Sequence, residues 1–225
     1  MAKPTTIKRL LSYFFDFSLE SRSSELNKTL SVVLSRGRFR LDAENATYSF
    51  EDKYRSFYTA FEKTKLANKK LKDILVLGLG LGSIPVMLEK NFNQNLESIT
   101  AVELDPVVVD LAKKYLPTSI SQKTDFVCED AFNFKNPSNK KYDLIAFDVF
   151  IDDFTDEQFR STEYLQSLKN LLTNNGTLYY NLMTDNRESQ QRAELFLGDA
   201  FRVVFPDGVR IDTGGNWVLV NASMI

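Results

Sequence analysis

The chain has 225 residues, of which 43% are apolar and 26% are charged, with 28 Lys and Arg against 30 Asp and Glu, one Cys and no His. This composition predicts a soluble globular protein with a full hydrophobic core and argues against low-complexity and disordered classes. The absence of His excludes Ser–His–Asp and Cys–His catalytic machinery and His-ligated zinc. The single Cys128 excludes an internal disulfide bond and favours a cytoplasmic protein.

The charge balance changes near residue 70. Residues 1–70 carry 14 basic and 8 acidic side chains, whereas residues 71–225 carry 14 and 22. We therefore expect a basic N-terminal appendage over 1–70 and an acidic main domain over 71–225. The longest apolar run, Ile74 to Leu88, is interrupted by glycines and Pro85, so no membrane span is expected. Acidic residues close behind Lys8 and Arg9 argue against a signal peptide.

The appendage is predicted to contain a small β-hairpin and a helix. Thr29–Ser35 and Phe39–Asp42 have the pattern of strands. Glu51–Ala67 has aromatic and aliphatic residues near helical spacing, which predicts one helix over that range.

Strands and helices then alternate along the main domain. The predicted strands are Ile74–Leu77, Ser98–Val102, Asp125–Cys128, Tyr142–Phe147, Thr177–Leu182, Phe201–Phe205 and Trp217–Val220. The predicted helices are Ser83–Lys90, Pro106–Tyr115 with Asp105 as N-cap, Asp156–Leu172 and Glu188–Leu197. Such alternation is typical of an α/β fold with a buried parallel sheet covered by helices on both faces. The last two predicted strands have no helix between them, so we expect five parallel strands followed by an antiparallel pair at one edge.

A glycine-rich loop follows the first strand of the main domain. Gly78, Gly80 and Gly82 would let the backbone turn tightly and approach a ligand, although a plain tight turn is the alternative. Glu103 ends the next strand, where a carboxylate can accept hydrogen bonds from both ribose hydroxyls of a nucleoside. The spacing is G-x-G-x-G rather than the G-x-G-x-x-G of dinucleotide sites, which favours a nucleoside without phosphates.

Two further carboxylates end the next two strands. Asp130 follows the third strand and Asp148 ends the fourth. Ligands of open α/β sheets bind beyond the carboxyl ends of the strands, so Glu103, Asp130 and Asp148 are expected to converge there.

The segments "ILVLGLGLGS", "ITAVELDPVVVDLAKKYLP", "FVCEDAFNF" and "KYDLIAFDVF" resemble successive motifs of class I S-adenosylmethionine-dependent methyltransferases, and particularly of their spermidine synthase-like branch. The resemblance covers roughly residues 70–222. It implies a Rossmann-like seven-stranded sheet with an antiparallel last strand and S-adenosylmethionine as cofactor. It also implies that Glu103 holds the ribose, that Asp130 with Ala131 faces the adenine, and that Gly78 to Gly82 pack against the methionine part.

The sequence departs from that family at both usual anchors of the cofactor's amino group. Val76 stands where many methyltransferases have an acid, and Leu81 stands where spermidine synthases have Asp. Of the family's Asp-Ser-x-Asp-Pro motif only Asp148 matches cleanly, and its Tyr-His-Glu element has no His counterpart. Methyl transfer is therefore favoured over aminopropyl transfer, which would use the decarboxylated cofactor.

An acidic segment follows the fourth strand. Asp148 and Asp152 are candidate catalytic residues that would bind or deprotonate a small, cationic or amine substrate, with a solvated acidic loop as the alternative. The aromatic residues Tyr48, Tyr54 and Tyr58 are candidates for the substrate side or for packing between the two units.

The basic residues of the appendage are a candidate binding surface. Arg36, Arg38 and Arg40 alternate, so a continuous strand would place them on one face toward an anionic partner. A hairpin turn at Arg36-Gly37 would remove this stripe and is favoured. With a pI near 5.4, no nucleic-acid partner is expected. A non-catalytic interaction module remains the second class, and homodimer formation is left open.

Overall fold

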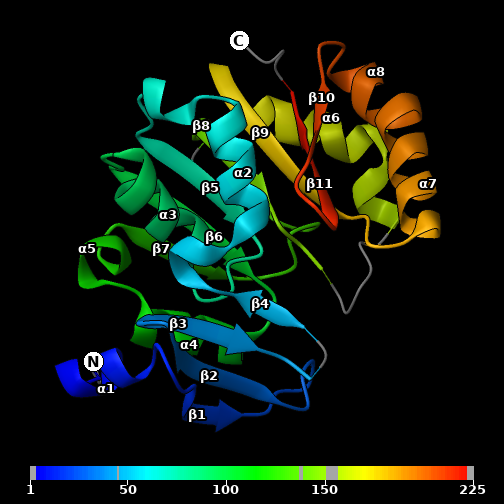
Figure 1. Ribbon diagram of the computed structural model, residues 1–225. Coiled ribbons are helices and arrows are strands. Elements are labelled where there is room, and N and C mark those ends of the chain that lie inside the picture. Colours follow the sequence, from blue (N-terminus) through cyan, green and yellow to red (C-terminus); the bar gives the residue numbers. More distant parts are fainter. Residues whose placement is uncertain (1–3, 45, 137–138, 151–156, 222–225) are drawn as a thin grey trace.

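The computed structural model describes residues 4–44, 46–136, 139–150 and 157–221. Two sheets make up the fold, with the N-terminal sheet beneath the carboxyl ends of the main sheet's parallel strands (Figure 1). The first part of the chain comprises α1 (Thr6–Leu11), β1 (Phe17–Arg22), β2 (Leu30–Ser35), β3 (Arg38–Asp42), β4 (Thr47–Ser49), a 3-10 turn (Glu51–Lys53), α2 (Arg55–Lys63) and a second 3-10 turn (Leu66–Asn68).

The main sheet has seven strands in the order β10-β11-β9-β8-β5-β6-β7. Its strands are β5 (Asp73–Leu77), β6 (Ser98–Glu103), β7 (Thr124–Cys128), β8 (Tyr142–Phe147), β9 (Leu172–Met183), β10 (Val209–Asp212) and β11 (Asn216–Val220). The strands β7, β6, β5, β8 and β9 pair in parallel, and β11 pairs antiparallel with both β9 and β10. The predicted α/β fold, with a mostly parallel seven-stranded sheet, is confirmed.

Helices cover both faces of this sheet (Figure 1). They are α3 (Ser83–Phe92), α4 (Pro106–Tyr115), α5 (Thr118–Ser121), α6 (Thr162–Leu171), α7 (Arg187–Phe196) and α8 (Arg202–Val204), with a 3-10 turn at Glu157–Arg160 and a π-helical turn at Leu197–Phe201. The predicted N-cap Asp105 accepts a hydrogen bond from the Val107 backbone, which fixes the start of α4 directly after β6. No helix among the described residues combines the length and apolar character that a membrane span needs.

The predicted strand Phe201–Phe205 is wrong, because this segment is helical. Phe201, Val204 and Phe205 are buried in one hydrophobic cluster, while Arg202 and Val203 are exposed. Buried residues at positions i, i+3 and i+4 lie on one face of a helix. Five residues are too few to separate this period from that of a strand. The first strand of the edge pair is instead β10, which follows Gly208.

Two predicted helices are shorter in the structure. The helix predicted over Asp156–Leu172 begins at Thr162, where the Ser161 side chain caps it by accepting from the Tyr164 backbone; residue 156 lies outside the described residues. The helix predicted over Glu51–Ala67 is interrupted twice. Tyr54 is extended and Lys65 is left-handed, with φ of 52°, so only Arg55–Lys63 forms α-helix.

The N-terminal sheet has four antiparallel strands in sequential order, two more than predicted. The turn between β2 and β3 is a hairpin, with positive φ at Arg36 and Gly37, so the three arginines do not form one continuous stripe. Arg38 forms an ion pair with Asp52, and the Arg40 guanidinium lies 2.8 Å from Asp42. These carboxylates neutralise the charges of Arg38 and Arg40, two of the three arginines in the predicted stripe.

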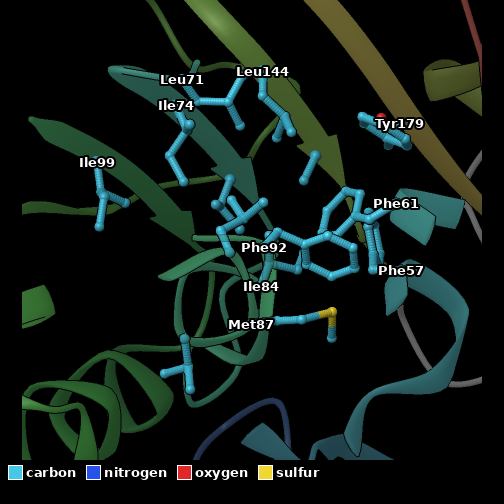
Figure 2. Packing of buried hydrophobic residues seen from close by; sticks show 14 of the residues in the cluster. Phe57, Phe61, Leu71, Ile74, Ile84, Met87, Phe92, Ile99, Leu144 and Tyr179 are labelled. Atoms are coloured by element: carbon cyan, nitrogen blue, oxygen red, sulfur yellow. The ribbon is translucent and has the colours of Figure 1, made fainter. Parts of the chain in front are cut away.

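Helix α2 packs on the main sheet, although it lies before the charge boundary near residue 70. Phe57 and Phe61 of α2 are fully buried and point toward Phe92 and Met87 of α3 (Figure 2). The Phe61 ring also meets Tyr179 of β9 edge to face, with ring centroids 4.8 Å apart. The aromatic residues of α2 thus join the chain's N-terminal part to the centre of the main sheet.

Candidate functional site

The glycine loop joins β5 to α3 and depends on left-handed backbone at three positions. Gly78, Gly80 and Gly82 have φ of 85°, 53° and 81°, which favours glycine at each. A Cβ on Gly78 would overlap the carbonyl oxygen of Asp148. Gly78 and Gly80 line a cavity of about 220 Å³, whereas Gly82 is not among its described lining residues and packs against Leu116.

Glu103, at the end of β6, is held by the backbone of the glycine loop. Its Oε2 accepts from the N–H groups of Leu79 at 3.1 Å and Gly80 at 3.2 Å, and its Oε1 accepts from Asp105 at 3.1 Å. Burial raises the pKa of Glu103, and these backbone donors oppose the rise. The carboxylate lines the cavity in a fixed orientation.

Asp148 lies just beyond the end of β8, next to β5, and is the centre of a polar cluster. Its Oδ1 accepts from the Tyr54 hydroxyl at 3.0 Å and from the Asn181 amide at 2.8 Å. The pKa of Asp148 is raised to about 7: burial and the negative charge of Glu103 raise it, and the hydrogen bonds from Asn181 and Tyr54 oppose the rise. Asn216 of β11 extends the cluster by donating to the Asn181 side-chain oxygen at 3.1 Å.

Asp130 and Ala131 lie at the β7 end of the same cavity. Asp130 Oδ1 accepts from the Phe132 backbone N–H at 2.9 Å, so it also caps the turn after β7. Asp152 lies outside the described residues. The described lining contains four carboxylates and no Lys or Arg, which favours a cationic ligand; these are Glu103, Glu129, Asp130 and Asp148.

The two positions that lack the family's acid are both buried among apolar side chains. Val76 is fully buried inside β5. Leu81 is 4% exposed and packs with Leu30 and Val32 of the N-terminal sheet and with Leu111 of α4. The loop position that carries Asp in spermidine synthases therefore serves here as a hydrophobic contact between the two sheets.

Three residues in or next to the cavity were not predicted from sequence. Met183 and Asn216 line the cavity from two paired strands, whereas Asn181 is fully buried, is not among the described lining residues and contacts Asp148. The isolated polar residue inside the apolar segment "LYYNLM" was the available signal for Asn181. Of the three tyrosines considered, Tyr48 and Tyr54 line the cavity, whereas Tyr58 packs against Phe92.

Comparison with curated proteins finds relatives of two kinds. The chain is 32% identical over 125 residues to the polyamine aminopropyltransferase of Vibrio vulnificus, covering 54% of this chain and 41% of that protein. It is 26% identical over 204 residues to the eEF1A lysine and N-terminal methyltransferase homolog of Drosophila melanogaster, covering 86% of this chain and 29% of that protein. The chain thus spans less than half the length of these relatives.

Solved structures and a family model complete the comparison. The fold is similar to human methyltransferase-like protein 13 in complex with SAH, with a TM-score of 0.57, 24% identity and coverage of 75% of this chain and 79% of that one. It is also similar to spermidine synthase from Thermotoga maritima, with a TM-score of 0.61, 15% identity and coverage of 90% and 71%. The spermine/spermidine synthase domain model matches residues 60–207. The chain belongs to the spermine/spermidine synthase domain family.

Proposed function

We propose that this protein transfers a methyl group from S-adenosylmethionine to a small amine. The observation that carries the proposal is Glu103, a carboxylate held in place by the glycine loop at the end of β6 and facing the cavity. This is the position at which nucleoside-binding α/β folds place the acid that accepts from ribose hydroxyls. The methyltransferase-like and spermidine synthase-like neighbours support a ligand of this class.

The residues around the cavity fit such a cofactor. Glu103 would hold the ribose, and Asp130 with Ala131 would face the adenine. Gly78 and Gly80 line the cavity and would face the methionine part. When bound, the cofactor supplies an alkyl group activated by a sulfonium. The carboxylates of the lining would hold the positively charged group in the cavity.

Asp148 is proposed to act on the acceptor. An amine nucleophile needs its lone pair, so a proton must leave the nitrogen. A carboxylate with a pKa of about 7 can receive that proton near neutral pH. Tyr54 and Asn181 hold the receiving carboxylate, and Asp152 is proposed to assist in binding the cationic acceptor.

Aminopropyl transfer is the second candidate. The family match and the 32% identical relative from Vibrio vulnificus support it. The burial of Leu81 in an apolar cluster is a departure from the spermidine synthase pattern, because the loop then supplies no carboxylate. In the aminopropyl case the decarboxylated cofactor would bind in the same cavity.

Isothermal calorimetry with S-adenosylmethionine, its decarboxylated form and S-adenosylhomocysteine tests these proposals. Preference for the first and third supports methyl transfer, and preference for the decarboxylated form supports aminopropyl transfer. If none of the three binds, the chain is a non-catalytic module that keeps the fold, and the proposal is wrong.

A pair of variants tests the role of Glu103. Glu103→Ala should weaken S-adenosylhomocysteine binding by roughly 10- to 100-fold, because charge-assisted hydrogen bonds are lost. Glu129→Ala is the matched control, since Glu129 lines the same cavity but is exposed and lies beyond β7, and we expect less than about a threefold change. Equal effects of the two substitutions would contradict the assignment.

A further inference from the structure

A closed ring of contacts joins the N-terminal sheet to the cavity, and we call it the Asn27 ring. The Tyr48 hydroxyl donates to Asn27 Oδ1 at 2.8 Å, and Asn27 Nδ2 donates to Asp105 Oδ2 at 2.8 Å. The Asp105 backbone donates to Glu103 Oε1 at 3.1 Å, and the Gly80 backbone donates to Glu103 Oε2 at 3.2 Å. The ring closes by backbone proximity and not by a hydrogen bond, since the Tyr48 carbonyl oxygen lies 3.3 Å from the place where a Cβ on Gly80 would stand.

The Asn27 side chain suits its place in this ring. A primary amide donates through its nitrogen and accepts through its oxygen, and Asn27 uses both functions on two different partners. Its partner Asp105 is 2% exposed, so that buried carboxylate needs donors. The Ser24 hydroxyl and the Val107 backbone are further donors to it. A side chain at this position that only donates would lose the hydrogen bond from Tyr48, and one that only accepts would lose the hydrogen bond to Asp105.

Three members of the Asn27 ring line the cavity, namely Tyr48, Gly80 and Glu103. The other two connect them through the loop between β1 and β2 and through the start of α4. A shift of Asn27 would therefore act on the cavity wall at Tyr48 and on the carboxylate of Glu103 together.

We propose that Asn27 is a positioning residue that holds Tyr48 and Glu103 in the arrangement that binds the cofactor. The N-terminal sheet is then part of the binding site. This inference rests on the proposed function, because its effect on binding acts through Glu103 and the ribose.

A double-mutant cycle tests the inference by calorimetry with S-adenosylhomocysteine. Asn27→Leu should weaken binding about tenfold and Tyr48→Phe about threefold, because each loses hydrogen bonds of the ring. The double variant should bind like Asn27→Leu, since Tyr48→Phe then removes a hydroxyl whose partner is already gone. If the double variant instead loses affinity by the product of the two single losses, Asn27 and Tyr48 act independently and the coupling between them is refuted. Unchanged affinity of Asn27→Leu would overturn the positioning role.

A second variant and a control separate positioning from folding. Asn27→Asp keeps an acceptor for Tyr48 but sets a carboxylate against Asp105, and it should weaken binding at least as much as Asn27→Leu. Ser31→Ala changes a residue of β2, the strand that follows the Asn27 loop; its hydroxyl contacts Ser21, and the affinity of this variant should be unchanged. Wild-type affinity for Asn27→Asp would refute the link to Asp105.

Amide hydrogen exchange measured by NMR without ligand distinguishes failure of this inference from failure of the proposed function. In Asn27→Leu the amides of Gly80 and Asp105 should exchange at least about tenfold faster, and in Ser31→Ala they should not. If the wild type binds no cofactor, the proposed function fails, and the positioning role for cofactor binding fails with it. Faster exchange would then establish the ring as a structural link alone. Unchanged exchange would overturn the ring itself.

Discussion

Replacing Asp148 by Asn removes a charge from the cavity without removing either hydrogen bond that its side chain accepts from Tyr54 and Asn181. The Tyr54 hydroxyl and the Asn181 amide both donate to Oδ1, and an amide oxygen can accept from both. The substitution therefore isolates the free energy of burying the carboxylate.

The pKa of Asp148 gives the expected size and sign of the effect. Burial raises this pKa from 3.8 to about 7, so the folded protein keeps a proton that the unfolded chain has already released. The stability that this proton contributes is present at low pH and is lost as the pH rises through the folded-state pKa. At about 1.4 kcal/mol per pKa unit, wild type should lose about 2 kcal/mol relative to Asp148→Asn between about pH 5.5 and about pH 8.5. Because the side chain opens onto a cavity, this value is an upper bound.

Urea unfolding of both proteins at the two pH values measures this difference. The free energy of unfolding of Asp148→Asn should exceed that of wild type by a margin that grows with pH. A margin that stays constant or shrinks would refute the argument that Asp148 is a desolvated carboxylate. Turnover of the variant should fall by at least about 100-fold at about pH 8.5, because the proposed proton acceptor is gone, and by less at about pH 5.5, where wild-type Asp148 is itself mostly protonated.

Two further predictions concern the glycine loop. Gly78→Ala should lower the free energy of unfolding by more than about 3 kcal/mol. The control Gly214→Ala should lower it by about 1 kcal/mol, because Gly214 has a similar φ of 80° but no heavy atom within 4 Å of the new Cβ. Equal losses in urea unfolding would contradict the close approach of Asp148 to Gly78. Leu81→Asp should cost about 3 kcal/mol in the same assay, against less than about 1.5 kcal/mol for Leu81→Met, because a charge enters an apolar cluster. A stable Leu81→Asp protein that binds S-adenosylmethionine more tightly would show that this position can serve as an anchor.

The main domain was largely predictable because its signals are local. The pattern from Asp73 to Phe147 alternates apolar strands with helices, and each strand ends at or just before a glycine or an acid. The same reasoning failed at Phe201–Phe205, where packing against neighbouring aromatic residues selects a helix from an ambiguous apolar run. It also missed β1, whose residues Phe17–Arg22 are mostly polar and form a sheet edge.

The order of elements, the glycine loop and the acids at the strand ends follow from residues close together in the chain, which is why they could be read from sequence. The polar clusters around the cavity depend on longer distances. Asn27 and Asp105 are 78 positions apart, and Tyr54 and Asp148 are 94 apart. No local pattern encodes such a pair, because a hydrogen bond between distant residues exists only once both sheets have packed and removed water from between them. Tertiary structure alone therefore decided how Tyr54 reaches the cavity and how Asn27 connects Tyr48 to Asp105, and it placed Leu81 in an apolar cluster between the two sheets.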